Sequence, residues 1–554
     1  MRTPVIPRAL ARLVLPVALA ALGASCRSSV VAIPGGSDAI QRSPREVRLV
    51  EAFHDAYAAR YDDALASIDR LANEDPSDPA PDLARAHVHC LRALLAGDVF
   101  ANDANVSAMA EAAESALEKA EARLAANPDD RLALRARGYA RSYVARVHVI
   151  TGSALKAVWH AQGGAADLAT SLRDAPDASV EADPFLFLGF FHYMAALSPA
   201  LVRAVGSVLN LTADCDLGKR ELEHAAANGF LYRDEANLTI AFISLLDREA
   251  DYARSLEILA DIRRRFPDNP GFALVQFMAQ RKAEDYAGAE ATLRGVLALD
   301  PATTPEPILL GARVILASLL AEENRFEESE AMLRDLVAEE GDSAERIRAR
   351  LFLGLGQVAE RRGDRAKAEA LYREAEESIP IALRWDQDSL KRDVKSRLEK
   401  PMTPDEIELR FISGEELRGD PASAVALADR MRARLEAAGE GDGESAAEAS
   451  YRRGRALARL GRHAEAEADL RAAATSESAT ARVRGGARFE LGRSLFVAGD
   501  EKAGREELEA LAADSGATDD KSRSLARRFL ESPAAAPPTG PLFLTPAGRG
   551  PESR

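Results

Sequence analysis

Apolar residues recur every three or four positions along most of this chain, which is the spacing of one face of an α-helix. The stretch from 351 to 380, LFLGLGQVAERRGDRAKAEALYREAEESIP, shows two such patterns separated by a polar turn. Pro380 closes the second pattern, because proline lacks the N–H that a continuing helix needs. Strand patterns are absent from the sequence. The spacing therefore predicts an all-α protein built of helix pairs.

Two glycines of this stretch, Gly354 and Gly356, also fit the opening of a dinucleotide-binding loop. Such a loop follows a buried strand and belongs to a βαβ unit. The preceding residues, DSAERIRARLFL, are charged at every third or fourth position, which indicates a helix. We therefore interpret the glycines as packing residues where two helices touch, and we predict no cofactor.

The same helix pair resembles a tetratricopeptide repeat. In that repeat an aromatic residue, a Leu-Gly pair and a small residue of the first helix meet an alanine and an aromatic residue of the second, and a proline follows. The matching residues here are Phe352, Leu355, Gly356, Ala359, Ala368, Tyr372 and Pro380. The resemblance implies a tetratricopeptide-like α-solenoid of antiparallel helix pairs, in which stacking buries one continuous core.

The pattern recurs along the chain. Two earlier repeats lie 34 residues apart, the period of this family, as shown by the intervals from Tyr252 to Tyr286 and from Pro267 to Pro301. Near the C-terminus, Gly454 aligns with Gly492 and Gly461 with Gly499, at an interval of 38 residues. Independent matches at a similar period favour a repeat protein over several unrelated domains.

Changes in composition divide the chain into segments. We expect a signal peptide at 1–26, a flexible tether at 27–45, N-terminal helical repeats at 46–178, an apolar central helical segment at 179–235, regular repeats at 236–399, C-terminal repeats at 404–531 and a disordered Pro/Gly-rich tail at 532–554.

The N-terminal sequence predicts where in the cell the protein is located. A basic stretch, ten apolar residues and the sequence GASC form a secretory signal that is too short to span a bilayer. Because it ends in Cys26, it resembles a bacterial lipoprotein signal, which implies that Cys26 is acylated and becomes the mature N-terminus. Gly23 stands where that family usually has leucine, so ordinary cleavage remains the alternative. Arg27 favours the outer membrane, with the protein facing the periplasm.

Charge narrows the class of partners. The chain has 72 basic and 88 acidic residues, and loss of the three arginines of the leader makes it more acidic still. Nucleic-acid-binding proteins need a basic surface, so we predict no nucleic acid partner. Charge would not hold this chain to an anionic membrane either, which leaves the lipid on Cys26 as the predicted membrane attachment.

The sequence has no pattern typical of a catalytic or metal site. HExxH, CxxC, P-loop and Gly-x-Ser-x-Gly motifs are absent, and His87 and His89 are two apart, which points them to different helix faces. We therefore predict a protein that is not an enzyme, with no catalytic residues and no metal. Cys90 and Cys215 are expected to be free buried thiols, with one disulfide as the alternative.

The most apolar part of the chain runs from Phe185 to Leu197 and is interrupted only by His192. We interpret residues 185–209 as core; a membrane-dipping hairpin or a pocket for an apolar ligand are the alternatives. Residues 183–301 are faintly similar to the tetratricopeptide family 39, which implies a helical, membrane-associated adaptor.

A candidate partner-binding groove lies in the last two repeats. Aligning their glycines superposes Tyr451 on Phe489 and Arg455 on Arg493. In each repeat the ring and the arginine are four residues apart, so they share one helix face. Arginine binds carboxylates through two parallel hydrogen bonds, so such a face suits an extended peptide with a carboxylate. The alternative is that both rings are core and both arginines are solvated, pairing with neighbours such as Glu448 and Glu490.

These features predict a non-enzymatic scaffold of the bacterial cell envelope that binds protein or peptide partners. The alternative is a periplasmic accessory protein of a transport system that binds a small molecule or a lipid.

Overall fold

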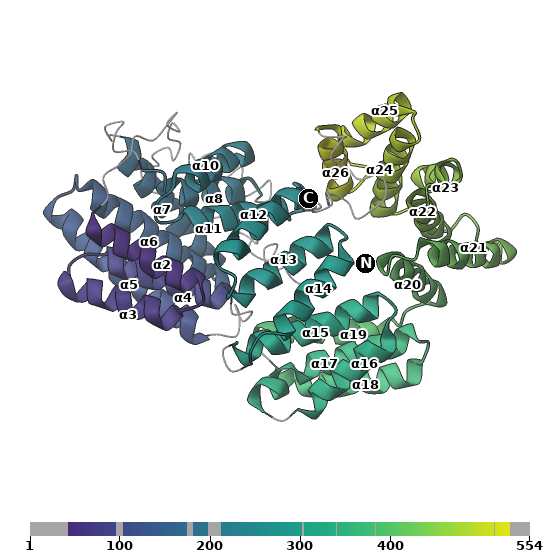
Figure 1. Ribbon diagram of the computed structural model, residues 1–554, viewed down its shortest axis with the longest axis horizontal. Coiled ribbons are helices and arrows are strands. Elements are labelled where there is room, and N and C mark those ends of the chain that lie inside the picture. Colours follow the sequence, from purple (N-terminus) through teal and green to yellow (C-terminus); the bar gives the residue numbers. More distant parts are fainter. Residues whose placement is uncertain are drawn as a thin grey trace, which may run out of the picture. The chain divides into compact units, whose positions relative to one another are not determined.

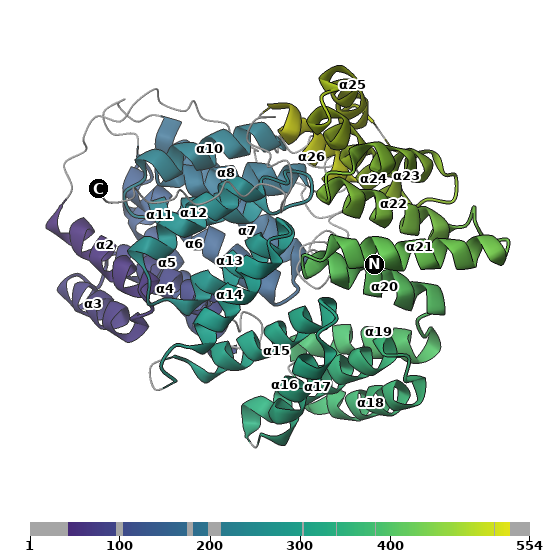
Figure 2. The same cartoon turned by 45° about the vertical axis from the view of Figure 1, so that its right-hand side comes forward.

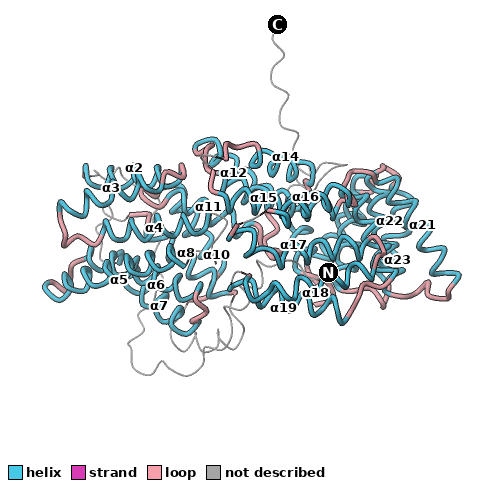
Figure 3. Tube along the Cα trace, turned by 90° about the horizontal axis from the view of Figure 1, so that it is seen from below, coloured by secondary structure: helices cyan, strands magenta, loops and turns pink. Residues whose placement is uncertain are grey.

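The computed structural model describes residues 43–95, 103–173, 181–197, 212–301, 304–339, 341–382, 384–514 and 516–531. Within these residues the chain is helical with connecting turns and contains no strand (Figures 1 and 3). The predicted all-α class is confirmed. The chain divides into two units, the first of residues 1–241 and 261–272 and the second of residues 242–260 and 273–554.

The first half of the chain supplies long helices, most of them joined by short turns. They are α2 (Pro44–Tyr57), α3 (Tyr61–Glu74), α4 (Ala80–Leu95), α5 (Asp103–Ala126), α6 (Arg131–Ile150), α7 (Ala154–Arg173), α8 (Pro184–Ala196), α10 (Cys215–Asn228), α11 (Arg233–Ser244), α12 (Tyr252–Arg265) and α13 (Pro270–Lys282). From α2 to α8 each helix packs on the next in sequence, and α8 packs on α10; the most extensive of these contacts are α6 on α7 and α8 on α10.

The second half continues in helix pairs, with the same neighbour-on-neighbour packing (Figure 2). Its helices are α14 (Tyr286–Leu297), α15 (Glu306–Glu322), α16 (Phe326–Ala338), α17 (Asp342–Arg361), α18 (Arg365–Ser378), α19 (Arg384–Glu399), α20 (Pro404–Leu417), α21 (Pro421–Ala437), α22 (Glu444–Arg459), α23 (His463–Thr475), α24 (Ala481–Val497), α25 (Glu501–Ala512) and α26 (Asp520–Glu531). A 3₁₀ turn at Ile379–Ile381 contains Pro380 and ends α18, as predicted.

Glycine lets paired helices approach closely. A Cβ on Gly356 would lie 2.4 Å from the ring of Tyr372 in the next helix, and a Cβ on Gly454 or Gly492 would lie 2.7 or 2.6 Å from a leucine of its partner helix. Atoms at these distances overlap, so only glycine fits. The interpretation of Gly356 as a packing residue, and not as part of a nucleotide loop, is confirmed.

The turns within helix pairs share one backbone feature. Two residues before the second helix of a pair, a residue adopts the left-handed conformation, which favours glycine because it has no Cβ. Glycine occupies this position at Gly363, Gly419, Gly461 and Gly499, whereas other residues occupy it at Ala59, Ala250, Glu284 and Asn324. A residue other than glycine costs about 1–2 kcal/mol in this conformation, so those turns carry strain.

Alanine at Gly356 should lower the stability of the second unit by about 1–3 kcal/mol, because the Tyr372 ring is buried and its hydroxyl donates a 2.8 Å hydrogen bond to Glu360. Urea unfolding followed by circular dichroism measures this loss. The control is Gly311→Ala, where a Cβ meets nothing within 4 Å and alanine should be neutral or stabilising by up to about 1 kcal/mol. Equal effects at both positions would contradict the packing role of Gly356.

Candidate functional site

The four residues of the predicted groove lie on α22 and α24, and all four are buried. Tyr451 and Arg455 are 8% and 7% exposed, and Phe489 and Arg493 are 2% and 6% exposed. The ring and the guanidinium of α22 share one face, as their spacing predicts, with the Arg455 carbon 5.7 Å from the centre of the Tyr451 ring. The structure therefore brings Tyr451 and Arg455 together, and it places all four residues inside the protein, not on an open surface.

The guanidinium of Arg455 is held by a carboxylate from the preceding helix pair. Its Nε and Nη2 donate hydrogen bonds of 3.0 and 2.7 Å to the two oxygens of Glu416, a residue of α20 that is fully buried. This fork-to-fork arrangement is the strongest form of arginine–carboxylate pair. Arg452 approaches the same carboxylate at 3.4 Å. Glu416 is thus a fixed structural partner of α22.

A second carboxylate reaches Arg455 from a distant part of the same unit. Glu284 lies in the turn between α13 and α14, and its oxygens are 3.3 and 3.4 Å from Nη1 of Arg455. Arg459, one helical turn after Arg455, donates a 3.0 Å hydrogen bond to Glu284. Burial alone would raise the pKa of Glu284, but Arg455, Lys521, Arg459 and Arg493 lower it to about 2. Glu284 is therefore ionised and is surrounded by cations.

Phe489 and Arg493 form a simpler arrangement. Phe489 packs edge-on against the ring of Phe529 at 6.5 Å between centroids, and Arg493 pairs with Glu490 at 2.8 Å. The alternative in which the arginines pair with neighbouring carboxylates named Glu490 as such a partner, and this pair is present. The two rings are buried in the core, as that alternative also expected. Glu448, in contrast, pairs with Arg452 and Arg482 and not with Arg455. Both arginines are buried, so the expectation that they are solvated is wrong.

Sequence reasoning missed Glu284, Glu416 and Arg459. Arg459 lies four residues after Arg455, so the helical spacing that grouped Tyr451 with Arg455 also points to it. Glu416 and Glu284 have no comparable signal, because they lie 39 and 171 residues from Arg455.

The first unit contains a separate buried polar cluster lined by aromatic rings. Glu235 of α11 accepts a 2.6 Å bond from Arg146, and Nδ1 of His87 lies 3.0 Å from both Glu235 and the hydroxyl of Tyr143. Cys90 lies 3.4 Å from Arg146, and burial raises the pKa of its thiol. A reactive cysteine needs a depressed pKa, which Cys90 does not have. The cluster therefore has the character of an internal ion-pair network.

Other predicted features of the first unit have clear outcomes. Cys90 and Cys215 form no disulfide with each other, and the former is buried and the latter partly buried. His87 contacts Tyr143 whereas His89 contacts Asn105, so the two histidines do point to different faces. His192, the polar residue of the apolar segment, is fully buried on α8 and lies 2.6 Å from Glu221. Residues 198–209, the rest of the segment interpreted as core, lie outside the described residues.

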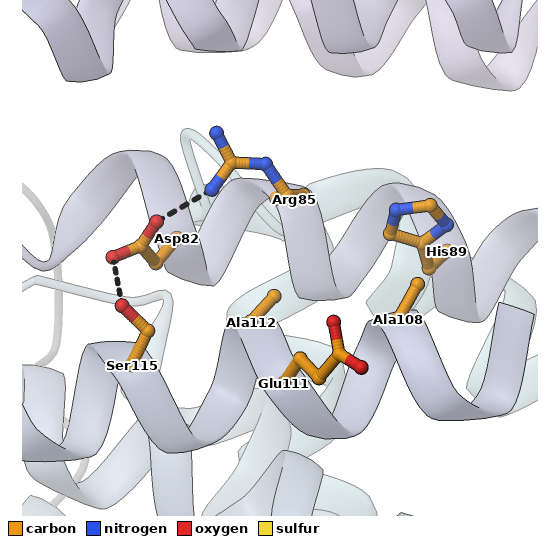
Figure 4. A pocket seen from close by; sticks show the side chains of 7 residues that line it. All are labelled: Asp82, Arg85, His89, Ala108, Glu111, Ala112 and Ser115. Carbon is orange, nitrogen blue, oxygen red and sulfur yellow. Dashed lines mark hydrogen bonds and ion pairs between the residues drawn. The ribbon is translucent and has the colours of Figure 1, made fainter.

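A shallow polar pocket of about 220 Å³ lies between α4 and α5 (Figure 4). Asp82 is its buried carboxylate, and it is bound by Arg85 at 2.6 Å, by Ser115 at 2.9 Å and by Lys119 at 2.6 Å. His89 at the other end contacts Asn105 at 3.1 Å. The carboxylate of Asp82 is thus taken up by groups of the protein itself, whereas Glu111, the other carboxylate of the pocket, is exposed.

The described residues contain neither a membrane-spanning helix nor a metal-binding cluster. No helix among them has the length and apolarity needed to cross a membrane. No cluster of three or more histidine, cysteine, aspartate or glutamate side chains in that part of the chain has metal-binding geometry. Cys26, the predicted lipidation site, lies outside the described residues.

Comparison with known proteins adds one family match. Residues 447–480, which contain most of α22 and all of α23, match the family model of the tetratricopeptide repeat. No curated protein matches the chain.

Similar solved structures include a tetratricopeptide repeat protein from Parabacteroides merdae, 14% identical, which covers 54% of this chain and 97% of its own with a TM-score of 0.21. The human IFIT1 dimer with m7Gppp-AAAA is 13% identical and covers 72% and 91% with a TM-score of 0.35. The P58(IPK) TPR domain is 13% identical and covers 89% and 99% with a TM-score of 0.18. The helix pairs and the match at 447–480 make this chain an all-α, tetratricopeptide-like solenoid that contains a tetratricopeptide repeat.

Proposed function

We propose that this protein is a non-enzymatic scaffold of the bacterial cell envelope that binds protein or peptide partners. The observation that carries the proposal is the stack of helix pairs with a tetratricopeptide repeat at 447–480. A solenoid of this kind offers an extended surface and adds contacts repeat by repeat, which suits binding of a chain rather than chemistry on a small molecule.

We propose further that acylated Cys26 attaches the scaffold to the outer membrane, with the helical units in the periplasm. The leader sequence ending in GASC supports this address. The acidic balance of the chain agrees with lipid, and not surface charge, as the attachment.

The test of partner binding is capture by the full chain purified in a mild detergent, with bound proteins identified after crosslinking in cells. The scaffold predicts a discrete set of envelope proteins at stoichiometric amounts. Native mass spectrometry of the same preparation is the second arm, because a co-purifying lipid with no protein partner would replace the scaffold with the ligand-binding alternative.

The anchor has its own test. Cys26→Ser should prevent acylation and move the protein from the membrane fraction to the soluble periplasmic fraction, whereas Cys90→Ser, the control, should leave it in the membrane fraction. Fractionation and immunoblotting measure the distribution. Membrane association that persists in Cys26→Ser would show that another part of the chain holds the membrane.

A further inference from the structure

The turn that carries Glu284 differs from the turns with glycine in one respect. Its left-handed position holds a glutamate with φ 62°, whereas the turns at Gly363, Gly419 and Gly461 have glycine at φ 73–80°. The glutamate brings a carboxylate to Arg455 and Arg459 at the cost of backbone strain. The strained residue is thus the one that makes the contact.

Two other turns without glycine also contact the C-terminal repeats within the second unit. The amide of Asn324 (φ 59°) donates to the carbonyl of Phe411 and to Glu415, both at 2.9 Å. Next to Ala250, Asp251 pairs with Arg528 at 3.2 Å. The three turns, at 250–251, 284 and 324, therefore contact α26, α22 and α20 respectively. Glu284 makes the middle one of these three contacts.

The two carboxylates on Arg455 are not equivalent. Glu416 is fully buried and takes the fork of the guanidinium at 2.7 and 3.0 Å. Glu284 is bound at 3.3 and 3.4 Å on the remaining nitrogen, and its side chain is 14% exposed. Nε of Arg459 is buried and has no hydrogen-bond acceptor. The geometry leaves Glu416 as the permanent partner and Glu284 as the weaker, solvent-reachable one.

We propose that Arg455 and Arg459 form a carboxylate-binding site for an acidic peptide of a partner, and that Glu284 is its internal occupant. This proposal rests on the proposed scaffold function and specifies that the partner presents a carboxylate. It also means that, without a partner, Glu284 blocks the binding site. An acidic side chain of the partner replaces Glu284, takes its bonds to Arg455 and Arg459, and frees the turn at 283–285.

The test uses the full chain in detergent and a fluorescein-labelled, acetylated peptide of four Gly-Glu units, with its Gly-Gln counterpart as the neutral probe. Glu284→Gly removes the occupying carboxylate. Glycine already occupies the same left-handed position in several equivalent turns, so this turn should keep its shape. Because an internal competitor lowers apparent affinity by the fraction of open sites, the variant should bind the Glu peptide about tenfold or more tightly than the wild type in fluorescence anisotropy.

Three controls separate this site from charge and backbone effects. Ala59→Gly makes the same backbone change in an equivalent turn of the first unit, and Glu440→Gln removes a negative charge from an exposed turn beside α22. Neither should change binding. Adding Arg459→Gln to Glu284→Gly should abolish the gain. A gain that survives this addition, or that appears equally with the Gly-Gln peptide, would overturn the proposal.

The wild type provides a reading that is independent of any variant. Saturating Gly-Glu peptide should speed amide hydrogen exchange at residues 283–286 several-fold while α22 stays protected. Unchanged exchange in this turn would contradict the proposal that Glu284 occupies the site. Equal affinity of Glu284→Gly and the wild type for the Gly-Glu peptide would contradict it as well. That result would leave the scaffold intact, since the crosslinking experiment reports partner binding through any surface.

Discussion

Reversing the charge of Arg455 by Arg455→Glu should destabilise the C-terminal repeats by about 3–5 kcal/mol. The new carboxylate would lie beside Glu416, which is fully buried and would lose its bidentate partner. A buried charge without a counter-charge is among the most costly defects in a folded protein. An exposed groove predicts the opposite, a protein that melts as the wild type does.

The measurement is hydrogen exchange of α20, α21 and α22, because repeat proteins unfold locally and one global midpoint averages over the stack. The matched control is Arg471→Glu. Arg471 is exposed and pairs with Glu467 within its own helix at 2.9 Å, a contact worth under about 1 kcal/mol. If the amides of α22 were equally protected from exchange in the two variants, Arg455 would not contribute to the stability of the repeats.

Acidification should destabilise the first unit through Glu235. Burial raises the pKa of this carboxyl, but Arg146 and His87 outweigh burial and lower it to about 2, from an ordinary 4.5. Between these values the unfolded chain binds a proton that the folded chain does not. The stabilisation is therefore complete above pH 4.5 and is lost as the pH falls toward 2, with a total of about 3 kcal/mol.

Glu235→Gln is the corresponding variant. It should already lose about 3–5 kcal/mol at neutral pH, because Arg146 is left with a neutral partner, and it should lack the additional loss in acid. Hydrogen exchange of α4, α6 and α11 between pH 7 and pH 3 follows the unit. Glu118→Gln, on the exposed face of α5, should keep both the wild-type stability and its pH dependence. An acid response that persists in Glu235→Gln would assign it to another group.

Local patterns predicted the helix pairs well. Gly356 and Tyr372 lie 16 residues apart, and the turn between them fixes how two antiparallel helices meet, so the sequence spacing alone predicts their contact. The same holds for the turn glycines Gly461 and Gly499, which adopt the left-handed conformation that a tight turn needs. Each of these features depends on residues within one repeat.

The candidate site was predicted only in part. Helical spacing placed Tyr451 beside Arg455, and that contact is present. Spacing does not say what covers the shared face, since that depends on neighbouring repeats. The partner binding itself stays a prediction, as do acylation of Cys26 and the envelope address.

The sequence by itself determined that this protein is a series of antiparallel helix pairs, because helix periodicity, close-packing glycines and turn residues act over short distances along the chain. Only the tertiary structure decided which charges are paired. Glu416 reaches Arg455 across one repeat boundary, and Glu284 reaches it across 171 residues, where the second unit brings distant turns onto α22. The physical reason is that an ion pair needs proximity in space, and in a stacked solenoid the curvature summed over many repeats sets that proximity.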